Sequence, residues 1–264
     1  FVPVPAPAEG ETQVIETKQL SKRYGDSLVL DHVDLRIPEG GVTSIIGANG
    51  AGKSTLLTAI ARLIDADGGT AEVAGMDVYA TDTRELAKIL AVLRQENHTL
   101  SRIRVRELVA FGRFPHSQGR LTAECEAAVD AAIETMELGE IADKFIDELS
   151  GGQRQRAFVA MVLAQDTEYI LLDEPLNNLD MKHSVSMMRT IKAAAHKQGR
   201  TVVIVIHDIN MAAAFSDRLV AMKNGKVHTT GTPEEVMTGE TLSSLYDFPV
   251  QVERIHGRPT AIYY

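Results

Sequence analysis

Apolar and polar residues alternate along the first part of the chain. Between Gln13 and Ile37, the stretches QVIETKQL and SLVLDHVDLRI carry short alternating runs, which are typical of strands in an antiparallel sheet. The apolar run GVTSII at 41–46 then leads into a glycine-rich loop. The stretch KSTLLTAIARLI at 53–64 has helical spacing and ends before the turn residues DADGG. The beginning of the chain therefore predicts strands, a glycine loop and a helix.

The middle of the chain has a different pattern. Between Gln95 and Ser150, the segments RELVAFGRF, AECEAAVDAAIETMEL and EIADKFIDEL repeat apolar residues at intervals of three and four, without a strong strand signal. This pattern predicts three helical segments. We therefore expect a helical subdomain at about 96–155, inserted into a chain of mixed α/β character.

Strands and helices alternate again after this insertion. The runs EYILLDEP at 168–175 and TVVIVIHD at 201–208 are rich in β-forming residues, and the stretch at 181–198 between them has helical spacing. Such alternation favours a largely parallel sheet covered by helices. Asn224-Gly225 lies between two apolar-rich segments and predicts a hairpin, and a short helical and stranded tail follows.

Composition narrows the class of protein. The charge of −9, from 36 acidic against 27 Lys and Arg residues, has the wrong sign for binding nucleic acid. Because no apolar run approaches about 20 residues, we expect no membrane span. Cys125 is alone, which excludes an intrachain disulfide and favours a reducing compartment. We expect residues 1–12, which lack signal-peptide features and an initial Met, to be a disordered leader within a longer chain, and 13–264 to be one domain.

A phosphate-binding loop is the strongest chemical signal. The stretch GANGAGKS fits the pattern G-x-x-x-x-G-K-[ST], in which backbone N–H groups wrap phosphate oxygens. Lys53 would neutralise the β and γ phosphates, and the Ser54 hydroxyl would hold Mg²⁺. The preceding strand and the following helix make a chance glycine turn a poor alternative. The candidate ATP-binding residues of this loop are Gly47, Ala48, Asn49, Gly50, Ala51, Gly52, Lys53, Ser54 and Thr55.

Two adjacent carboxylates end the apolar strand EYILLDEP. Asp173 is expected to face Mg²⁺ and Glu174 the attacking water, because neighbouring strand residues point to opposite sides. On their own, these acids are equally explained as solvated turn residues or a helix cap. The phosphate loop earlier in the chain favours the chemical interpretation.

Three further residues are candidate site residues only because these motifs are also present. His207 ends the run TVVIVI and is placed to donate a hydrogen bond to the γ phosphate or to position water; a structural histidine is the alternative. Gln95 offers an amide oxygen to Mg²⁺, or is an ordinary surface residue. Tyr24 is placed to stack on adenine, or is a turn residue before Gly25.

Two more features need an explanation. The stretch LSGGQRQR at 149–156 is a second turn suited to an oxyanion, but without a lysine, and it opens a predicted helix. A local basic run against the acidic background is explained either as a solvated helix face or as a docking surface for a membrane partner. This run comprises Arg102, Arg104, Arg106, Arg113 and Arg120.

From about Gln13 onward, the chain resembles the ATP-binding subunit of ABC transporters. The phosphate loop, Gln95, LSGGQ, LLDEP, NNLD and His207 follow the order and similar spacing of that family. The resemblance implies an α/β fold: a P-loop NTPase core with an antiparallel β subdomain and a helical subdomain. It also implies that a second copy of the chain contributes its signature to the γ phosphate. The signature residues are Ser150, Gly151, Gly152 and Gln153.

The resemblance also assigns roles to single residues. Glu174 becomes the general base or water-polarising acid, His207 the switch histidine, Asp180 the D-loop acid across the dimer and Tyr24 the adenine-stacking ring. The metal ligands become Ser54, Gln95 and Asp173. One departure is NNLD at 177–180, where many family members have Ser-Ala-Leu-Asp; it leaves open how Asn177 and Asn178 take part in communication between sites.

Within the family, LVAFGRFPHSQGRLT and LLDEPLNNLDMKHS resemble the importers of iron(III) siderophores, with haem and cobalamin importers as close relatives. The implied protein is an ATPase on the cytoplasmic face of the membrane, which dimerises head to tail around two ATP·Mg²⁺. Its implied partners are permease subunits and, indirectly, a substrate-binding protein. A soluble ATPase switch unconnected to transport is the alternative of a different class.

Overall fold

The computed structural model describes residues 13–95, 102–117 and 119–263, so the expected leader at 1–12 lies outside the described residues. The chain divides into two compact units. The first unit contains the chain up to Thr81 and from Thr201 onward, and the second unit is Asp82–Arg200. The second unit is wider than the helical insertion expected at 96–155, because it also holds a pair of strands and a long helix.

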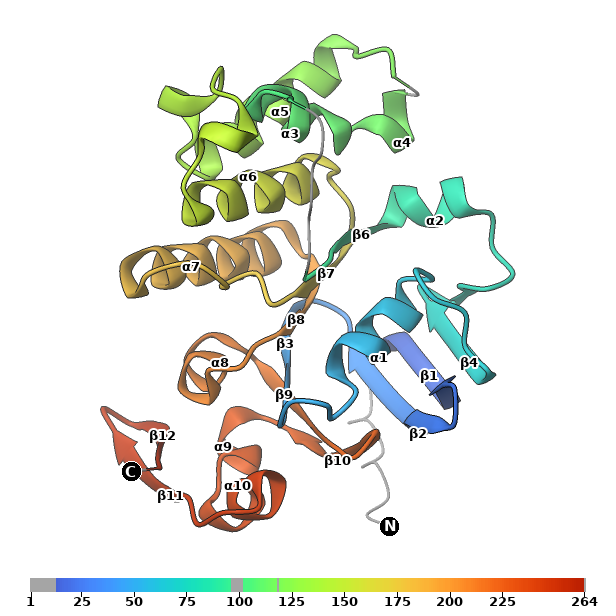
Figure 1. Cartoon of the computed structure of the whole chain (residues 1–264), viewed down its shortest axis with the longest axis vertical. Helices are drawn as coiled ribbons and strands as arrows, with labels where there is room; N and C mark the ends of the chain where they lie inside the picture. Colours follow the sequence, from blue (N-terminus) through green and yellow to red (C-terminus); the bar gives the residue numbers. More distant parts are fainter. Residues whose placement is uncertain (1–12, 96–101, 118, 264) are drawn as a thin grey trace. The chain divides into compact units, whose positions relative to one another are not determined.

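The first unit begins with an antiparallel sheet, as the alternating pattern predicts. The sheet has the order β2-β1-β4-β5, and Figure 1 labels its first three strands. The side chains of Leu30, Leu35 and Ile37 on one face of β2 are buried, while polar residues between them are exposed or half-buried. The strands are β1 (Gln13–Tyr24), β2 (Ser27–Pro38), β4 (Gly68–Val73) and β5 (Met76–Asp77).

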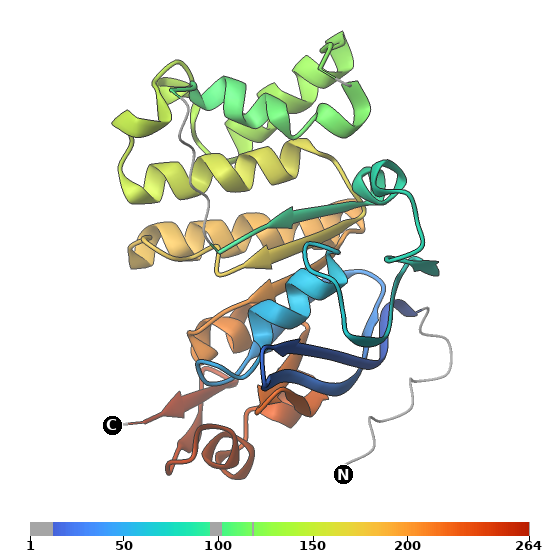
Figure 2. The same cartoon turned by 45° about the vertical axis from the view of Figure 1, so that its right-hand side comes forward.

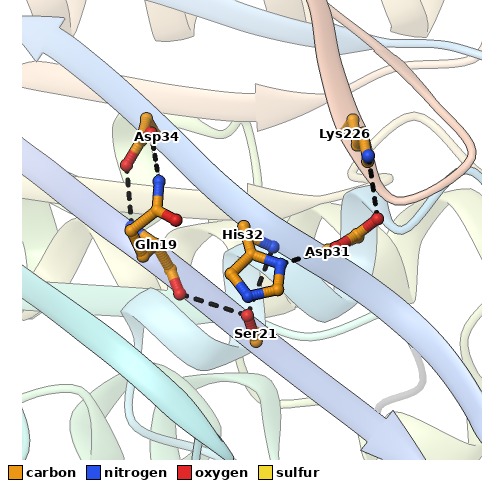
Figure 3. Close-up of polar contacts among 6 residues, drawn as sticks. All are labelled: Gln19, Ser21, Asp31, His32, Asp34 and Lys226. Atoms are coloured by element: carbon orange, nitrogen blue, oxygen red, sulfur yellow. Dashed lines mark hydrogen bonds and ion pairs between the residues drawn. The ribbon is translucent and has the colours of Figure 1, made fainter.

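Irregular pairing bends the long hairpin of β1 and β2. Gln19 and His32 both have φ of 50°, near the register shifts of the ladder. Both oxygens of the Asp34 carboxylate accept hydrogen bonds from Gln19, at 2.7 Å from its backbone nitrogen and 2.6 Å from Nε2 (Figure 3). This carboxylate replaces part of the ladder that the bulge interrupts.

Parallel strands form the other sheet of the first unit. β3 lies between β8 and β9 and is parallel to both, whereas β10 is antiparallel to β9. Asn224 and Gly225 join β9 to β10 with φ of 50° and 76°, which confirms the predicted hairpin turn. The strands are β3 (Gly41–Ile46), β8 (Thr201–Val205), β9 (Arg218–Lys223) and β10 (Lys226–Gly231).

Short helices and a hairpin complete the first unit. The helix after the glycine loop ends earlier than 53–64 predicts, because Arg62 adopts a left-handed φ of 55° and terminates the helix. The predicted tail is present, with one strand, β12, that the sequence pattern did not predict. The elements are α1 (Lys53–Ile60), α8 (Ile209–Phe215), α9 (Pro233–Val236), α10 (Gly239–Tyr246), β11 (Gln251–Ile255) and β12 (Arg258–Ile262).

The second unit combines a strand pair with helices. β6 and β7 run parallel and side by side (Figure 2), and helices α3 and α5 pack on α6 (Figure 1). All five residues of β7 are buried, as expected for a strand covered on both faces. The elements are α2 (Thr83–Ile89), β6 (Leu90–Leu93), α3 (Val105–Phe111), α4 (Phe114–Ser117), α5 (Ala123–Thr135), α6 (Gly151–Ala164), β7 (Tyr169–Asp173) and α7 (Met181–Gln198).

One predicted helix is wrong. The segment EIADKFIDEL forms two 3₁₀ turns, Gly139–Ile141 and Ile146–Glu148, instead of an α-helix. Its backbone pairs with a neighbouring segment: the Ile146 nitrogen donates to the Ile103 carbonyl at 3.0 Å, and the Lys144 carbonyl accepts from Val105 at 3.0 Å. These bonds use the groups that a helix would need for itself.

No helix within the described part of the chain has the length and apolar character needed to cross a bilayer. Cys125 lies on α5 and its thiol is buried.

Candidate functional site

The phosphate loop of the first unit is shaped by glycines at two close approaches. Gly47 has φ of 145°, and a Cβ there would lie 2.2 Å from the Met222 carbonyl oxygen. At Gly52, with φ of 97°, a Cβ would lie 2.8 Å from the Val29 carbonyl oxygen. Only glycine fits such contacts, so the loop can run flush against β9 and β2 before α1 begins.

Lys53 lies beneath this loop. Its side chain is 5% exposed, and Nζ donates to the carbonyl oxygens of Gly47 at 2.9 Å and Ala48 at 3.0 Å. The loop therefore wraps around the ammonium group while α1 presents its first N–H groups, which no helical carbonyl accepts. An ammonium group and a helix N-terminus at one loop are groups suited to binding phosphate, and phosphate binding here remains a prediction.

The turn between β9 and β10 forms a backbone hydrogen bond with the phosphate loop. The Gly225 nitrogen donates to the Ala51 carbonyl at 3.1 Å, and the Gly225 carbonyl accepts from Asp31 at 2.9 Å. Lys226 also forms an ion pair of 2.9 Å with the Asp31 carboxylate (Figure 3). The sequence pattern predicts the hairpin but not its hydrogen bonds to the phosphate loop and to β2.

Tyr246 also contacts the phosphate loop, and the sequence pattern did not predict this contact. Burial raises the pKa of Tyr246 to about 12, and a hydrogen bond with the backbone of Gly47 opposes this rise. The residue ends α10, about two hundred positions after the loop it contacts, and no local motif identifies it.

The first unit also holds Tyr24 and His207. Tyr24, at the end of β1, is 52% exposed, and Nζ of Lys22 lies 5.7 Å from the centre of its ring. His207 is exposed in the connection from β8 to α8, directly before Asp208, which caps α8 by accepting from the Met211 nitrogen at 2.9 Å. Adenine stacking and phosphate contact by these side chains remain predictions.

The two adjacent acids lie at the end of β7 in the second unit. Asp173 is 2% exposed and Glu174 is 8% exposed, which excludes the solvated-turn interpretation. Glu174 has a left-handed φ of 50° and precedes Pro175, although a residue before proline prefers extended backbone. Such strain is found mainly at functional sites.

Two amide groups hold the Glu174 carboxylate. Nε2 of Gln95 donates to Oε2 at 2.8 Å, and Nδ2 of Asn177 donates to the same oxygen at 2.7 Å. The structure thus brings Gln95 to Glu174 across 79 positions of sequence. Metal ligation by the Gln95 oxygen remains a prediction, and Asn177 is a site residue that the sequence analysis noticed only as a departure from a motif.

The LSGGQ turn opens α6, as predicted. Ser150 caps the helix: Oγ accepts from the Gln153 nitrogen at 3.2 Å, and Oε1 of Gln153 accepts from the Ser150 nitrogen at 3.1 Å. A Cβ on Gly151 would lie 3.2 Å from Cβ of Asn178, and one on Gly152 would lie 3.2 Å from the Leu179 side chain. The turn therefore packs against the loop that follows Glu174.

Asp180 caps α7 at the end of this loop. Oδ1 accepts from the backbone nitrogen of His183 at 2.8 Å and contacts its Nδ1 at 2.7 Å. These two bonds hold the pKa of the Asp180 carboxyl below its usual range. The loop between Glu174 and α7 is thus fixed at both ends.

Each unit offers one oxygen donor of the kind that Mg²⁺ prefers. The first unit offers the Ser54 hydroxyl and the second unit offers the Asp173 carboxylate. Among the residues whose placement is described, no group of three or more His, Cys, Asp or Glu side chains forms a metal cluster. Magnesium bound through few protein ligands is usually completed by phosphate oxygens and water.

The basic run does not form one exposed surface. Arg113 is 4% exposed, and its Nη1 donates to the carbonyls of Ala164 at 2.9 Å and Gln165 at 3.1 Å. The Arg102 guanidinium stacks over Phe145 at 4.3 Å. Arg106 forms an ion pair of 2.5 Å with Asp130, and Arg104 lies 5.6 Å from the Phe145 ring. Both interpretations of the basic run, a solvated helix face and a docking surface, are therefore wrong for Arg113, which supports the ends of α3 and α6.

Comparison with known proteins agrees with these features. The family model of the ABC transporter matches residues 30–177. The petrobactin import ATP-binding protein YclP of Bacillus subtilis is 48% identical over 251 residues, which is 95% of this chain and 100% of that protein. The petrobactin import ATP-binding protein FatE of Bacillus anthracis is 49% identical over 250 residues, with the same coverage of both chains.

A solved structure of an ATP-binding cassette also matches this chain. The ATP-binding cassette MJ0796, determined as a dimer in a post-hydrolysis state with ADP and phosphate, is 30% identical and has a TM-score of 0.75. The match covers 83% of this chain and 98% of that one. The chain belongs to the ABC transporter family, and it is an ATPase of that family.

Proposed function

We propose that this chain is the energy-coupling subunit of an importer for iron(III) siderophores. The observation that carries the proposal is the likeness, at 48% and 49% identity over the full length of both relatives, to two ATP-binding proteins of petrobactin import. Residues of this subunit do not touch the transported molecule in the proposed scheme. Its own chemistry is ATP hydrolysis, and the imported ligand is set by its partners.

The phosphate loop is proposed to bind ATP and Glu174 to direct its hydrolysis. Lys53 and the backbone of 47–52 hold the β and γ phosphates, with Tyr24 against adenine and Thr55 beside the loop. Ser54 and Asp173 are the proposed ligands of Mg²⁺, with Gln95 as a third. When bound, this ion neutralises charge that develops on the phosphates. Glu174 orients the attacking water and accepts its proton, and His207 donates a hydrogen bond to the γ phosphate.

A second copy of the chain is proposed to complete each site. Gly151 and Gly152 begin α6 after the Ser150 cap, and the N–H groups of this first turn are proposed to bind a phosphate of the ATP that a second protomer holds. The solved dimer of MJ0796 with ADP and phosphate supports the formation of a dimer with bound nucleotide. Asp180 is proposed to act across the same interface. Closure is then favoured only with ATP present, which drives permease subunits at the cytoplasmic face of the membrane.

A transport assay tests the proposed function. The chain is reconstituted with its permease and substrate-binding protein in liposomes containing ATP and Mg²⁺, and uptake of labelled ferric petrobactin, a ferric hydroxamate, haem and cobalamin is compared. We expect ATP-dependent uptake of a ferric siderophore, with no uptake when Mg²⁺ is chelated. Uptake restricted to haem or cobalamin would refute the siderophore assignment. If no polytopic membrane protein co-purifies with the chain from detergent extracts, that result would instead indicate a soluble ATPase switch.

A further inference from the structure

The loop Asn177-Asn178-Leu179-Asp180 contains a residue that contacts Glu174 twice. Nδ2 of Asn177 donates to Oε2 of Glu174 at 2.7 Å, and the Asn177 backbone nitrogen donates to the Glu174 carbonyl at 3.3 Å. We propose that Asn177 is a positioning residue, which holds the Glu174 carboxylate in its hydrolytic orientation. This inference rests on the proposed role of Glu174 in hydrolysis.

The backbone of Glu174 makes such support necessary. Glu174 has a φ of 50° and directly precedes Pro175. Residues in the left-handed region of backbone conformation persist only where the surrounding structure fixes them. The turn from Glu174 to Asn177 closes through the 3.3 Å backbone bond, while the side chain of the same asparagine fixes the carboxylate. Asn177 therefore contacts both the backbone and the side chain of Glu174.

The two amides on Oε2 differ in how far they are from Glu174 along the chain. Gln95 follows β6, 79 positions before Glu174, whereas Asn177 lies three positions after it in the same turn. The Asn177 contact therefore closes within a single turn of the chain. The Gln95 contact with the same oxygen depends on a segment distant in sequence.

The length and chemistry of the Asn177 side chain are essential to this role. A serine there, as in Ser-Ala-Leu-Asp, would keep the backbone bond but would end before it reaches Oε2. An aspartate would have the same shape but would bring a second carboxylate to the oxygen that now accepts the amide N–H. Both substitutions remove one hydrogen bond to a charged group, an interaction worth about tenfold in an equilibrium or rate.

Steady-state hydrolysis of ATP·Mg²⁺ by the full chain tests the proposal. For Asn177→Asp and Asn177→Ser we expect kcat to fall about tenfold while KM changes less than twofold, because ATP binding by the phosphate loop is untouched. Asn210→Asp is the matched control: it removes an amide donor that bonds the Ala261 carbonyl at 3.1 Å, far in sequence from β7. We expect the control to keep kcat within twofold. Unchanged kcat in both Asn177 variants would overturn the inference.

A double-mutant cycle separates positioning from a general structural effect. Asn177→Asp is introduced into Glu174→Gln, where no carboxylate remains to be oriented, and we expect kcat to fall less than twofold further. A further tenfold loss would show that Asn177 acts elsewhere and would overturn the inference. If Glu174→Gln alone kept more than a tenth of kcat, the proposed hydrolytic role of Glu174 would fail instead.

Discussion

The phosphate loop of the first unit and the acidic end of β7 in the second unit are built in contrasting ways. The loop forms within nine consecutive residues, and Lys53 bonds to the carbonyls of Gly47 and Ala48 in its own turn. The Glu174 carboxylate is instead held by Gln95 from a distant segment and by Asn177 from the loop that follows. The lysine and glycines of the loop therefore come from one short stretch of sequence, although Gly225 and Tyr246 also contact it. The carboxylate of the proposed hydrolytic residue is oriented partly from a distant segment.

This contrast predicts that the two regions fail differently. Changes in the phosphate loop should lower affinity for ATP and turnover together, because both require the bound phosphates. Changes around Glu174 or in the LSGGQ turn should lower turnover and leave affinity intact.

Removing the loop lysine should have the largest effect. We expect Lys53→Ala to weaken ATP binding about 100-fold and to remove measurable hydrolysis, because the ammonium group is lost from under the phosphates. Titration with a fluorescent ATP analogue measures the affinity. Lys88→Ala is the control, since Lys88 pairs only with the exposed Glu85 at 2.7 Å among the contacts the structure describes. Equal affinity for the Lys53 variant and the wild type would contradict the assignment of the loop.

The signature turn should affect turnover alone. We expect Ser150→Arg to lower hydrolysis at least about tenfold without changing the affinity of the isolated monomer for ATP, because this turn acts on the partner's nucleotide. Thr122→Arg provides the matched control: it removes the cap that accepts from Cys125 at 3.3 Å on α5 and should leave turnover unchanged. A large loss of monomer affinity in the Ser150 variant would return the turn to its own chain's site.

Stability, rather than turnover, should distinguish two glycines of the same loop. We expect Gly47→Ala to lower the free energy of unfolding by about 3 kcal/mol or more, because a Cβ would lie 2.2 Å from the Met222 carbonyl. Gly50→Ala should cost about 1 kcal/mol, since it meets nothing within 4 Å and strains only its φ of 78°. Urea unfolding without nucleotide measures both. Equal losses would show that close approach to β9 does not shape the loop.

Most of the fold and the local motifs could be predicted from the sequence. The strand, glycine loop and helix at 41–60, the hairpin at Asn224-Gly225 and the helix opening at Ser150 are each set by short-range spacing or turn chemistry. Each signal lies within a few residues of the feature that it predicts.

Two of the failures involve residues whose role is set from far along the chain, and a third lies within one turn. In the sequence Arg113 belongs to a basic run and is expected to be exposed. It is buried, and the carbonyls of Ala164 and Gln165 accept its hydrogen bonds. The segment EIADKFIDEL has helical spacing, but its backbone groups pair with residues 103–106. The contact of Asn177 with Glu174 spans only three residues, and it was missed because the strained turn between them has no sequence signature.

The most direct test of the division of roles is a paired measurement on Glu174→Gln. ATP affinity and the rate of ATP hydrolysis are determined on the same preparation, with Mg²⁺ present. The account predicts a Kd within about twofold of the wild type and a turnover reduced more than tenfold, a loss above about 1.4 kcal/mol of transition-state stabilisation. A turnover reduced less than tenfold, or a Kd that rises in parallel with the loss of turnover, would contradict it.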